Sequence, residues 1–176
     1  MISKYALDSK NYNDEYIEVT WETCTLRKWL NGDFYKNAFS ETEQNAIKTT
    51  TVKNDDNPGL GTEGGNDTKD KVFLLSLADM TNTGYGFIKE YYDPEPDNMK
   101  NRRCAPTAYV IAQGAWASDE YVTTDGNASA EWWLRSPGNH TRSAAFMQAN
   151  GFVDSYGYGV MSENTCVRPA MTIILK

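Results

Sequence analysis

Few residues of the chain are able to act as nucleophiles, bases or metal ligands. The 176 residues include one histidine, His140, and three cysteines, Cys24, Cys104 and Cys166. As a general base, His140 would need a nucleophile and an orienting acid, and no Gly-x-Ser-x-Gly signature surrounds the nearby serines. Zinc sites usually take four close Cys or His ligands, and these cysteines are far apart in the sequence. We therefore predict no catalytic residue, no metal site and no cofactor, and interpret His140 as a surface contact residue.

Oxygen ligands are more plentiful. Asp55-Asp56-Asn57 and residues 63–70 lie in a long polar, glycine-rich stretch over 54–71. Their spacing does not match an EF-hand loop, so a solvated loop is the expectation and a calcium site the weaker alternative.

Two arginines and two tryptophans stand in the most distinctive part of the sequence. Arg135 and Arg168 could clamp an anion or a sugar acid, because a guanidinium group pairs with carboxylates through two parallel bonds. We favour structural roles for both, as arginines that pair with an acid or bind loop carbonyls. Trp132 and Trp133 would face opposite sides of a strand, so at most one could be a carbohydrate platform. We expect core packing for the other tryptophan, or for both.

The same region, about 132–168, alternates short framework-like strings with chemically mixed side chains. On a strand, Ala145 and Met147 could face inward while Phe146 and Gln148 face outward. Tyrosine and phenylalanine supply rigid contact area and small polar residues supply adaptable hydrogen bonds, as in antibody paratopes. We expect substitution of the outward aromatic residues to change the melting temperature little. The predicted ligand-binding residues are Asn139, His140, Arg142, Phe146, Gln148, Asn150, Phe152, Asp154, Tyr156, Tyr158, Met161, Glu163 and Asn164.

The elements that must position these residues are short. Helices are predicted at 25–32, ended by Gly32, after the capping box of Ser40 and Glu43, near Ser76, and from Pro106 to Gly114. Residues 72–77 indicate a buried strand.

The carboxyl-terminal part of the chain is predicted to be mostly β. Asp125-Gly126 and Asn150-Gly151 indicate hairpin turns, and residues 132–136 and 167–175 indicate strands. The sequence predicts one α+β domain over residues 1–176.

Composition excludes several classes of protein. Hydrophobic residues make up 40% and aromatic residues 12%, which is too much for a disordered chain. The net charge of −7 argues against a protein that tracks nucleic-acid phosphates. No apolar run reaches the ~20 residues that a membrane span needs, and the first residues do not form a signal peptide.

Five strings of the sequence carry a resemblance that covers nearly the whole chain. They are WETCTLRKWLN at 21–31, CAPTAY at 104–109, WWLRSPG at 132–138, AA at 144–145 and VRPA at 167–170. They resemble an uncharacterised domain family of gut anaerobic bacteria. That family is similar to the C-type-lectin-like fold, which formylglycine-generating enzymes share with the variable proteins of diversity-generating retroelements.

The resemblance implies a C-type-lectin-like fold with short helices on antiparallel sheets. We expect a binding module for a protein or glycan ligand, at a cell surface or on a phage particle. The sharper hypothesis is a retroelement variable protein, because most residue types over 139–166 are reachable by adenine mutagenesis of asparagine codons. Gln148, Met161 and Glu163 fit that pattern less well.

Two alternatives stay open. The first is a carbohydrate-binding or adhesion domain without diversification. The second is a formylglycine-generating type of enzyme, which would need a cysteine pair near the carboxyl end where only Cys166 lies. The strings with which calcium-dependent lectins bind sugars are absent from the expected region.

Overall fold

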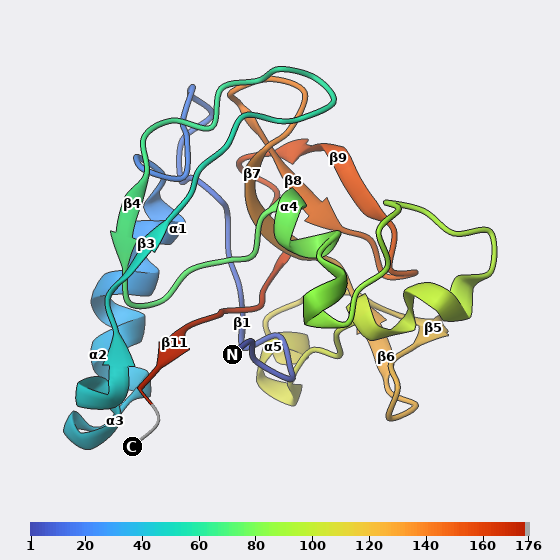
Figure 1. Cartoon of the computed structure of the whole chain (residues 1–176). Coiled ribbons are helices and arrows are strands. Elements are labelled where there is room, and N and C mark those ends of the chain that lie inside the picture. The colour runs from blue at the N-terminus through green and yellow to red at the C-terminus, as the bar shows by residue number, and fades with distance from the viewer. Residues whose placement is uncertain (175–176) are drawn as a thin grey trace.

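A five-stranded sheet forms the centre of the computed structural model, which describes residues 1–174 (Figure 1). The strand order is β1-β10-β7-β8-β9, and every neighbouring pair is antiparallel except β10 and β7. The pairing of β1 with β10 joins the beginning of the chain to its end. The strands are β1 (Asp8–Ser9), β7 (Trp132–Pro137), β8 (Ser143–Met147), β9 (Val153–Gly159) and β10 (Cys166–Val167).

Three two-stranded sheets lie around this centre. They pair β2 (Ile47–Lys48) with β11 (Thr172–Ile173), β3 (Thr50–Val52) with β4 (Thr68–Asp70), and β5 (Ala117–Val122) with β6 (Ala128–Ala130). The two predicted hairpins are confirmed, with Asp125-Gly126 between β5 and β6 and Asn150-Gly151 between β8 and β9. Gly151 has φ of 92°, and a Cβ there would lie 2.5 Å from the Met99 carbonyl oxygen. Only glycine fits this turn.

The first helix does not end at Gly32, so that prediction is wrong. Helix α1 (Thr25–Trp29) continues through a π-helical turn (Leu30–Phe34) into α2 (Tyr35–Ala38). The reason is that the apolar stripe continues, since both Phe34 and Tyr35 pack against the core.

The remaining helices are short, with four to seven residues in all but one of them, and most begin at a side-chain cap. Helix α3 (Glu41–Ala46) has the predicted capping box, and α4 (Leu77–Met80) begins with a second one at Ser76. Helix α5 (Ala108–Ala112) is capped by Thr107, so Pro106 precedes the helix instead of opening it. Two 3-10 segments span Thr83–Tyr85 and Pro96–Arg102. No helix within residues 1–174 is long and apolar enough to cross a bilayer.

Two predicted strands are only partly formed. Residues 72–77 are buried apart from the half-buried Phe73, but they form one isolated bridge, Phe73 to Ala170, and no continuous ladder. The final strand is divided into β10 and β11, because Pro169 between them has no N–H to donate to a ladder. The predicted end of that strand, Leu175, lies outside the described residues.

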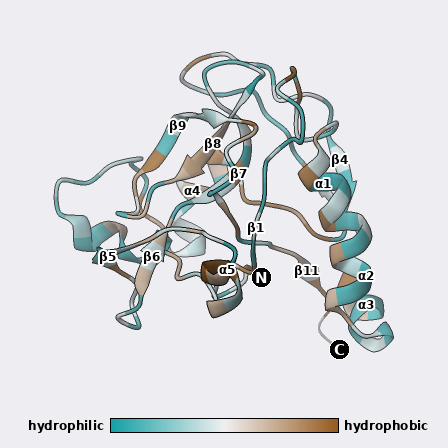
Figure 2. Ribbon diagram, turned by 180° about the vertical axis from the view of Figure 1, so that it is seen from behind, coloured by the Kyte–Doolittle hydropathy of each residue, from teal (hydrophilic) through white to brown (hydrophobic). Residues whose placement is uncertain are grey.

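The central sheet is covered on both faces. Trp132 and Met147 belong to one hydrophobic core, whereas Trp133 and Phe146 belong to a second core on the opposite side. Figure 2 shows hydrophobic residues on β8 at the centre, whereas the connecting loops are mostly teal or white. All residues of β7 and β8 are buried, so side chains from this part of the sheet cannot form a binding face.

Candidate functional site

Three loops that are far apart in the sequence meet at one end of the molecule, at the top of Figure 1. They are residues 13–20, 56–62 and 139–142. The Val19 N–H donates to the Thr141 carbonyl oxygen at 2.9 Å, and Arg142 and Glu18 form an ion pair at 3.4 Å. The first and third loops are therefore held against each other.

Asn57 fixes the second loop to the same end. Its side chain is 1% exposed, and its Nδ2 donates to the carbonyl oxygens of Pro137, Gly138 and Ser155 at 2.9–3.2 Å. Its Oδ1 accepts from the N–H groups of Gly59 and Leu60. One buried amide thus connects the long loop to the β7–β8 turn and to β9.

These anchored loops present a set of exposed side chains, which we call the loop surface. The Asn139 N–H donates to the Tyr156 carbonyl oxygen, and the Tyr16 ring lies close to Gly159. A hollow of about 280 Å³ between the first and third loops is lined by Tyr16, Glu18, His140, Thr141 and Arg142. The loop surface consists of Tyr16, Ile17, Leu60, Asn139, His140 and Arg142 on these loops, together with Tyr156 on β9 and Met161 just after β9. The segment with Met161 is joined to the third loop, because the Val160 N–H donates to the Arg142 carbonyl oxygen.

Phe146 is not part of any surface, so the prediction that it faces outward is wrong. It is 1% exposed and lies beneath Tyr158, whose ring stacks on it with centroids 3.9 Å apart. The predicted alternation assumed one solvated face, whereas the sheet is covered on both sides.

A second group of polar side chains lies beside Tyr158. Gln148 donates to an Asp154 carboxylate oxygen at 2.9 Å. Burial raises the pKa of the Glu131 carboxyl, the Tyr158 hydroxyl partly opposes this rise, and the Asp154 carboxylate adds to it. Glu131 was not among the predicted residues. Its position two residues before Trp133 was the available signal, because alternate residues of an extended chain face the same side.

The other predicted ligand-binding residues lie apart from the loop surface. Asn150 and Phe152 belong to the turn at the opposite end of β8, where Arg103 donates to the Asn150 carbonyl oxygen and Tyr92 packs on Phe152. Glu163 and Asn164 are exposed in the connection from β9 to β10. The structure thus brings Asn139, His140, Arg142, Tyr156 and Met161 together and separates the rest.

The arginines and tryptophans of the distinctive strings are bound into the fold. Arg135 pairs with Asp79 at 2.6 Å and also donates to the carbonyl oxygens of Leu74 and Lys53. Trp132 and Trp133 are both 0% exposed, so neither is a platform for a sugar. Arg168 donates to two backbone carbonyl oxygens and stacks on Trp132.

Several acidic residues of the long loop are engaged within the protein, whereas Asp55 and Glu63 are exposed. Asp56 accepts from the Gly64 N–H, and Asp70 pairs with Arg27 and accepts from the Trp21 indole. Within residues 1–174, no three Asp, Glu, His or Cys side chains lie close enough together to hold a metal ion.

The three thiols are buried and free. Burial raises the pKa of Cys24 and of Cys166 to about 12 and also raises that of Cys104. A thiol is a nucleophile only as its thiolate, so these are unreactive positions.

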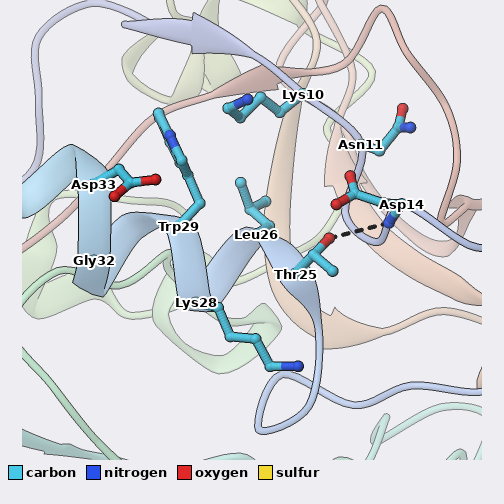
Figure 3. Close-up of a pocket in the computed structure, with 9 residues that line it drawn as sticks. All are labelled: Lys10, Asn11, Asp14, Thr25, Leu26, Lys28, Trp29, Gly32 and Asp33. Atoms are coloured by element: carbon cyan, nitrogen blue, oxygen red, sulfur yellow. Dashed lines mark hydrogen bonds between the residues drawn. The ribbon is translucent and has the colours of Figure 1, made fainter.

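A further pocket, separate from the loop surface, opens beside α1 (Figure 3). Its volume is about 360 Å³. Figure 3 shows the Trp29 indole standing on one side, Leu26 at the base and the Asp14 carboxylate opposite. The Lys10 ammonium lies 4.9 Å from the centroid of the indole ring.

The structure defines a mixed α/β protein with short helices, several antiparallel sheets and a cluster of anchored loops. The chain belongs to the family described as Domain of unknown function (DUF6273), whose model matches residues 1–175. Comparison with curated proteins and with solved structures finds no match. The family membership agrees with the resemblance to an uncharacterised family, and the lectin-like part of that resemblance stays a prediction.

Proposed function

We propose that this protein is a binding module that contacts a protein or another surface ligand through the loop surface. The observation that carries the proposal is the anchoring of three separate loops at one end of a sheet whose strands β7 and β8 are buried on both faces. Function is often placed on loops that a rigid scaffold positions. Exposed tyrosines next to Asn, His and Arg match the composition of adaptable paratopes.

A C-type-lectin-like fold is part of the proposal. Two features support it: β1 and β10 join the two ends of the chain, and short helices pack on a mainly antiparallel sheet. A fold does not by itself assign a ligand, so the ligand is argued from the loop surface alone.

The sharper form of the proposal is a variable protein of a diversity-generating retroelement, displayed at a cell surface or on a phage particle. Asn139, His140 and Tyr156 are exposed and are residue types that adenine mutagenesis of asparagine codons produces. Sequencing the neighbouring locus tests this form. A locus without a reverse transcriptase and without a near-duplicate template repeat would rule it out.

A pull-down from bacterial or host-cell surface extracts tests the binding role itself. Tyr16→Ala and Tyr156→Ala should each reduce capture of the bound ligand. Tyr109→Ala is the matched control, because Tyr109 is 60% exposed on α5 and Tyr156 is 63% exposed. Equal capture by all three variants would refute the role of the loop surface.

The pocket beside α1 favours a second candidate, a carbohydrate-binding domain. An indole face can pack on the apolar side of a sugar ring, and Asp14 and Asp33 can accept hydrogen bonds from its hydroxyls. Saturable binding on a glycan array that is lost in Trp29→Ala and kept in Trp116→Ala would support it. Trp116 is 59% exposed elsewhere on the chain, whereas Trp29 is half-buried and packs against the second core. The comparison therefore also requires that Trp29→Ala keeps the melting temperature of a folded protein.

An enzyme of the formylglycine-generating type is the least supported alternative. Its chemistry needs reactive thiols, and both Cys104 and Cys166 lie in the hydrophobic core with raised pKa values. A turnover assay on sulfatase peptides is expected to show no product.

A further inference from the structure

A small pocket at the β5–β6 hairpin collects positive charge in a protein whose net charge is −7. Its volume is about 90 Å³, smaller than that of the hollow between the loops and of the pocket beside α1. The charged residues that line it are Lys4, Lys100, Arg103, Arg168 and Asp125. Four cations therefore face one carboxylate, and that carboxylate is already paired with Lys4 at 2.7 Å.

Two of these cations are buried without an acidic partner. Arg103 is 6% exposed and Arg168 is 7% exposed, and within residues 1–174 neither forms an ion pair with a carboxylate. Buried charges in proteins are usually paired, because removing an ion from water is costly. In the same fold, Arg135 pairs with Asp79, and the fully buried Arg102 instead donates five hydrogen bonds to backbone carbonyl oxygens.

Backbone carbonyls use only part of the donor capacity of these two groups. A guanidinium group has five N–H donors. Arg168 bonds through Nε to Ser3 and through Nη1 to Arg102, and its Nη2 has no hydrogen-bond partner among the described residues. Arg103 directs one bond from each nitrogen to the carbonyls of Asn150, Val122 and Pro96. Donors therefore remain on both guanidinium groups.

We propose that this pocket binds a small oxyanion of the phosphate or sulfate type between Arg103, Arg168 and Lys100. Arginine matches such anions because its planar donors reach two oxygens at once. A doubly charged anion fits best, because three cations remain after Lys4 has paired with Asp125. The size of the pocket admits the anionic group alone, either as a free ion or as the end group of a larger ligand that extends outward.

Isothermal titration calorimetry with inorganic phosphate, and separately with sulfate, tests the proposal at an ionic strength fixed with sodium chloride. Saturable binding by the wild-type protein is expected. Lys100→Gln should weaken it about two- to fivefold, the range of a partly exposed charge pair. Asp125→Asn should tighten it by a similar factor, because it frees Lys4 and removes the negative charge of Asp125 from the pocket lining. A purely structural role for these residues would not produce tighter binding.

The matched control is a second exposed Lys–Asp ion pair, Lys53 with Asp67. Lys53→Gln and Asp67→Asn change the net charge in the same way and should leave the affinity unchanged. These four variants alter exposed or half-buried side chains, so the test does not depend on variants of the buried arginines, which could fail to fold. If neither anion shows saturable binding, the proposal is overturned. Equal changes of affinity in the site variants and the control variants would also overturn it.

Two further measurements complete the test. Phosphoserine that binds more tightly than inorganic phosphate would identify the end group of a larger ligand, and equal affinity would identify the free ion. Phosphate and sulfate also stabilise proteins by exclusion from their surface. A rise in melting temperature that is the same in the wild type and in Lys100→Gln would show that exclusion alone is at work and would refute the site.

Discussion

At the scale of single residues, the contrast between the buried Phe146 and the exposed Tyr156 distinguishes framework residues from surface residues. Phe146→Ala should destabilise the protein by about 3–5 kcal/mol, because it opens a cavity in the core that contains Trp133. Tyr156→Ala, at an exposed position, should change the free energy of unfolding by about 0.5 kcal/mol or less. Urea denaturation monitored by tryptophan fluorescence measures both. Similar losses of stability in the two variants would contradict the burial of Phe146 in the core.

Glu131 should make stability depend on pH. Its pKa is raised from 4.5 in the native state, chiefly by burial. The native protein therefore holds this proton more tightly than the unfolded chain. The resulting contribution to stability is complete below the unfolded pKa and is lost as the pH rises through the native pKa.

Glu131→Gln keeps the shape of the side chain and removes the titration. We expect this variant to be more stable than the wild type at about pH 7, and the difference to shrink as the pH approaches about 4. Thermal unfolding across this range measures it. Asp97→Asn, at an exposed acid, is the control; a difference for Glu131→Gln that grows at low pH would contradict the sign.

At the scale of elements, Asn57 holds the long loop in place. Asn57→Ala leaves three carbonyl oxygens without their donor, which should cost about 1–3 kcal/mol. Asn57→Asp has the same shape but places a carboxylate against those oxygens and should be at least as harmful. Hydrogen exchange at the Gly59 and Leu60 amides, which bond to Asn57, should accelerate in both variants. Unchanged exchange would show that the loop is held by other contacts.

Gly32 tests the path of the first helix. The helix passes through Gly32, its φ is not positive, and a Cβ there would have no neighbour within 4 Å. Gly32→Ala should therefore stabilise the protein by up to about 1 kcal/mol, through helix propensity. If the helix ended at a left-handed Gly32, as its sequence indicates, the same change would destabilise it. Chemical denaturation measures whether Gly32→Ala raises or lowers the free energy of unfolding.

The elements that the sequence predicted well are those fixed by local chemistry. Ser40 with Glu43 makes a capping box, and Asn150-Gly151 makes a hairpin, because neighbouring atoms decide both. The end of the first helix and the burial of Phe146 depend instead on which layers cover the helix and the sheet. Likewise, the anchoring of residues 56–62 by Asn57 depends on contacts about 80 positions away, which no local pattern contains.

At the scale of the whole molecule, the architecture separates a framework from a surface. The framework is β7 and β8 with a hydrophobic core on each side. The loop surface is joined to it mainly through backbone groups, such as the bond from Val19 to Thr141 and that from Asn139 to Tyr156. The side chains of Asn139, His140 and Arg142 also make contacts that hold the loops. The positions free to vary are therefore those whose exposed side chains make no such contact, such as Leu60, Tyr156 and Met161.

This separation predicts how the fold tolerates many substitutions at once. A library that randomises Ile17, Leu60, Tyr156 and Met161 together should consist mainly of folded variants, because surface changes cost about 0.5 kcal/mol or less each and are nearly additive when they do not touch. A library of equal size at Trp132, Leu134, Ala144 and Phe146 should be mostly unfolded. Protease resistance of displayed variants measures the folded fraction of each. Equal fractions would mean that the loop side chains support the fold, and a protein whose binding residues also hold it together could not serve as an adaptable binding module.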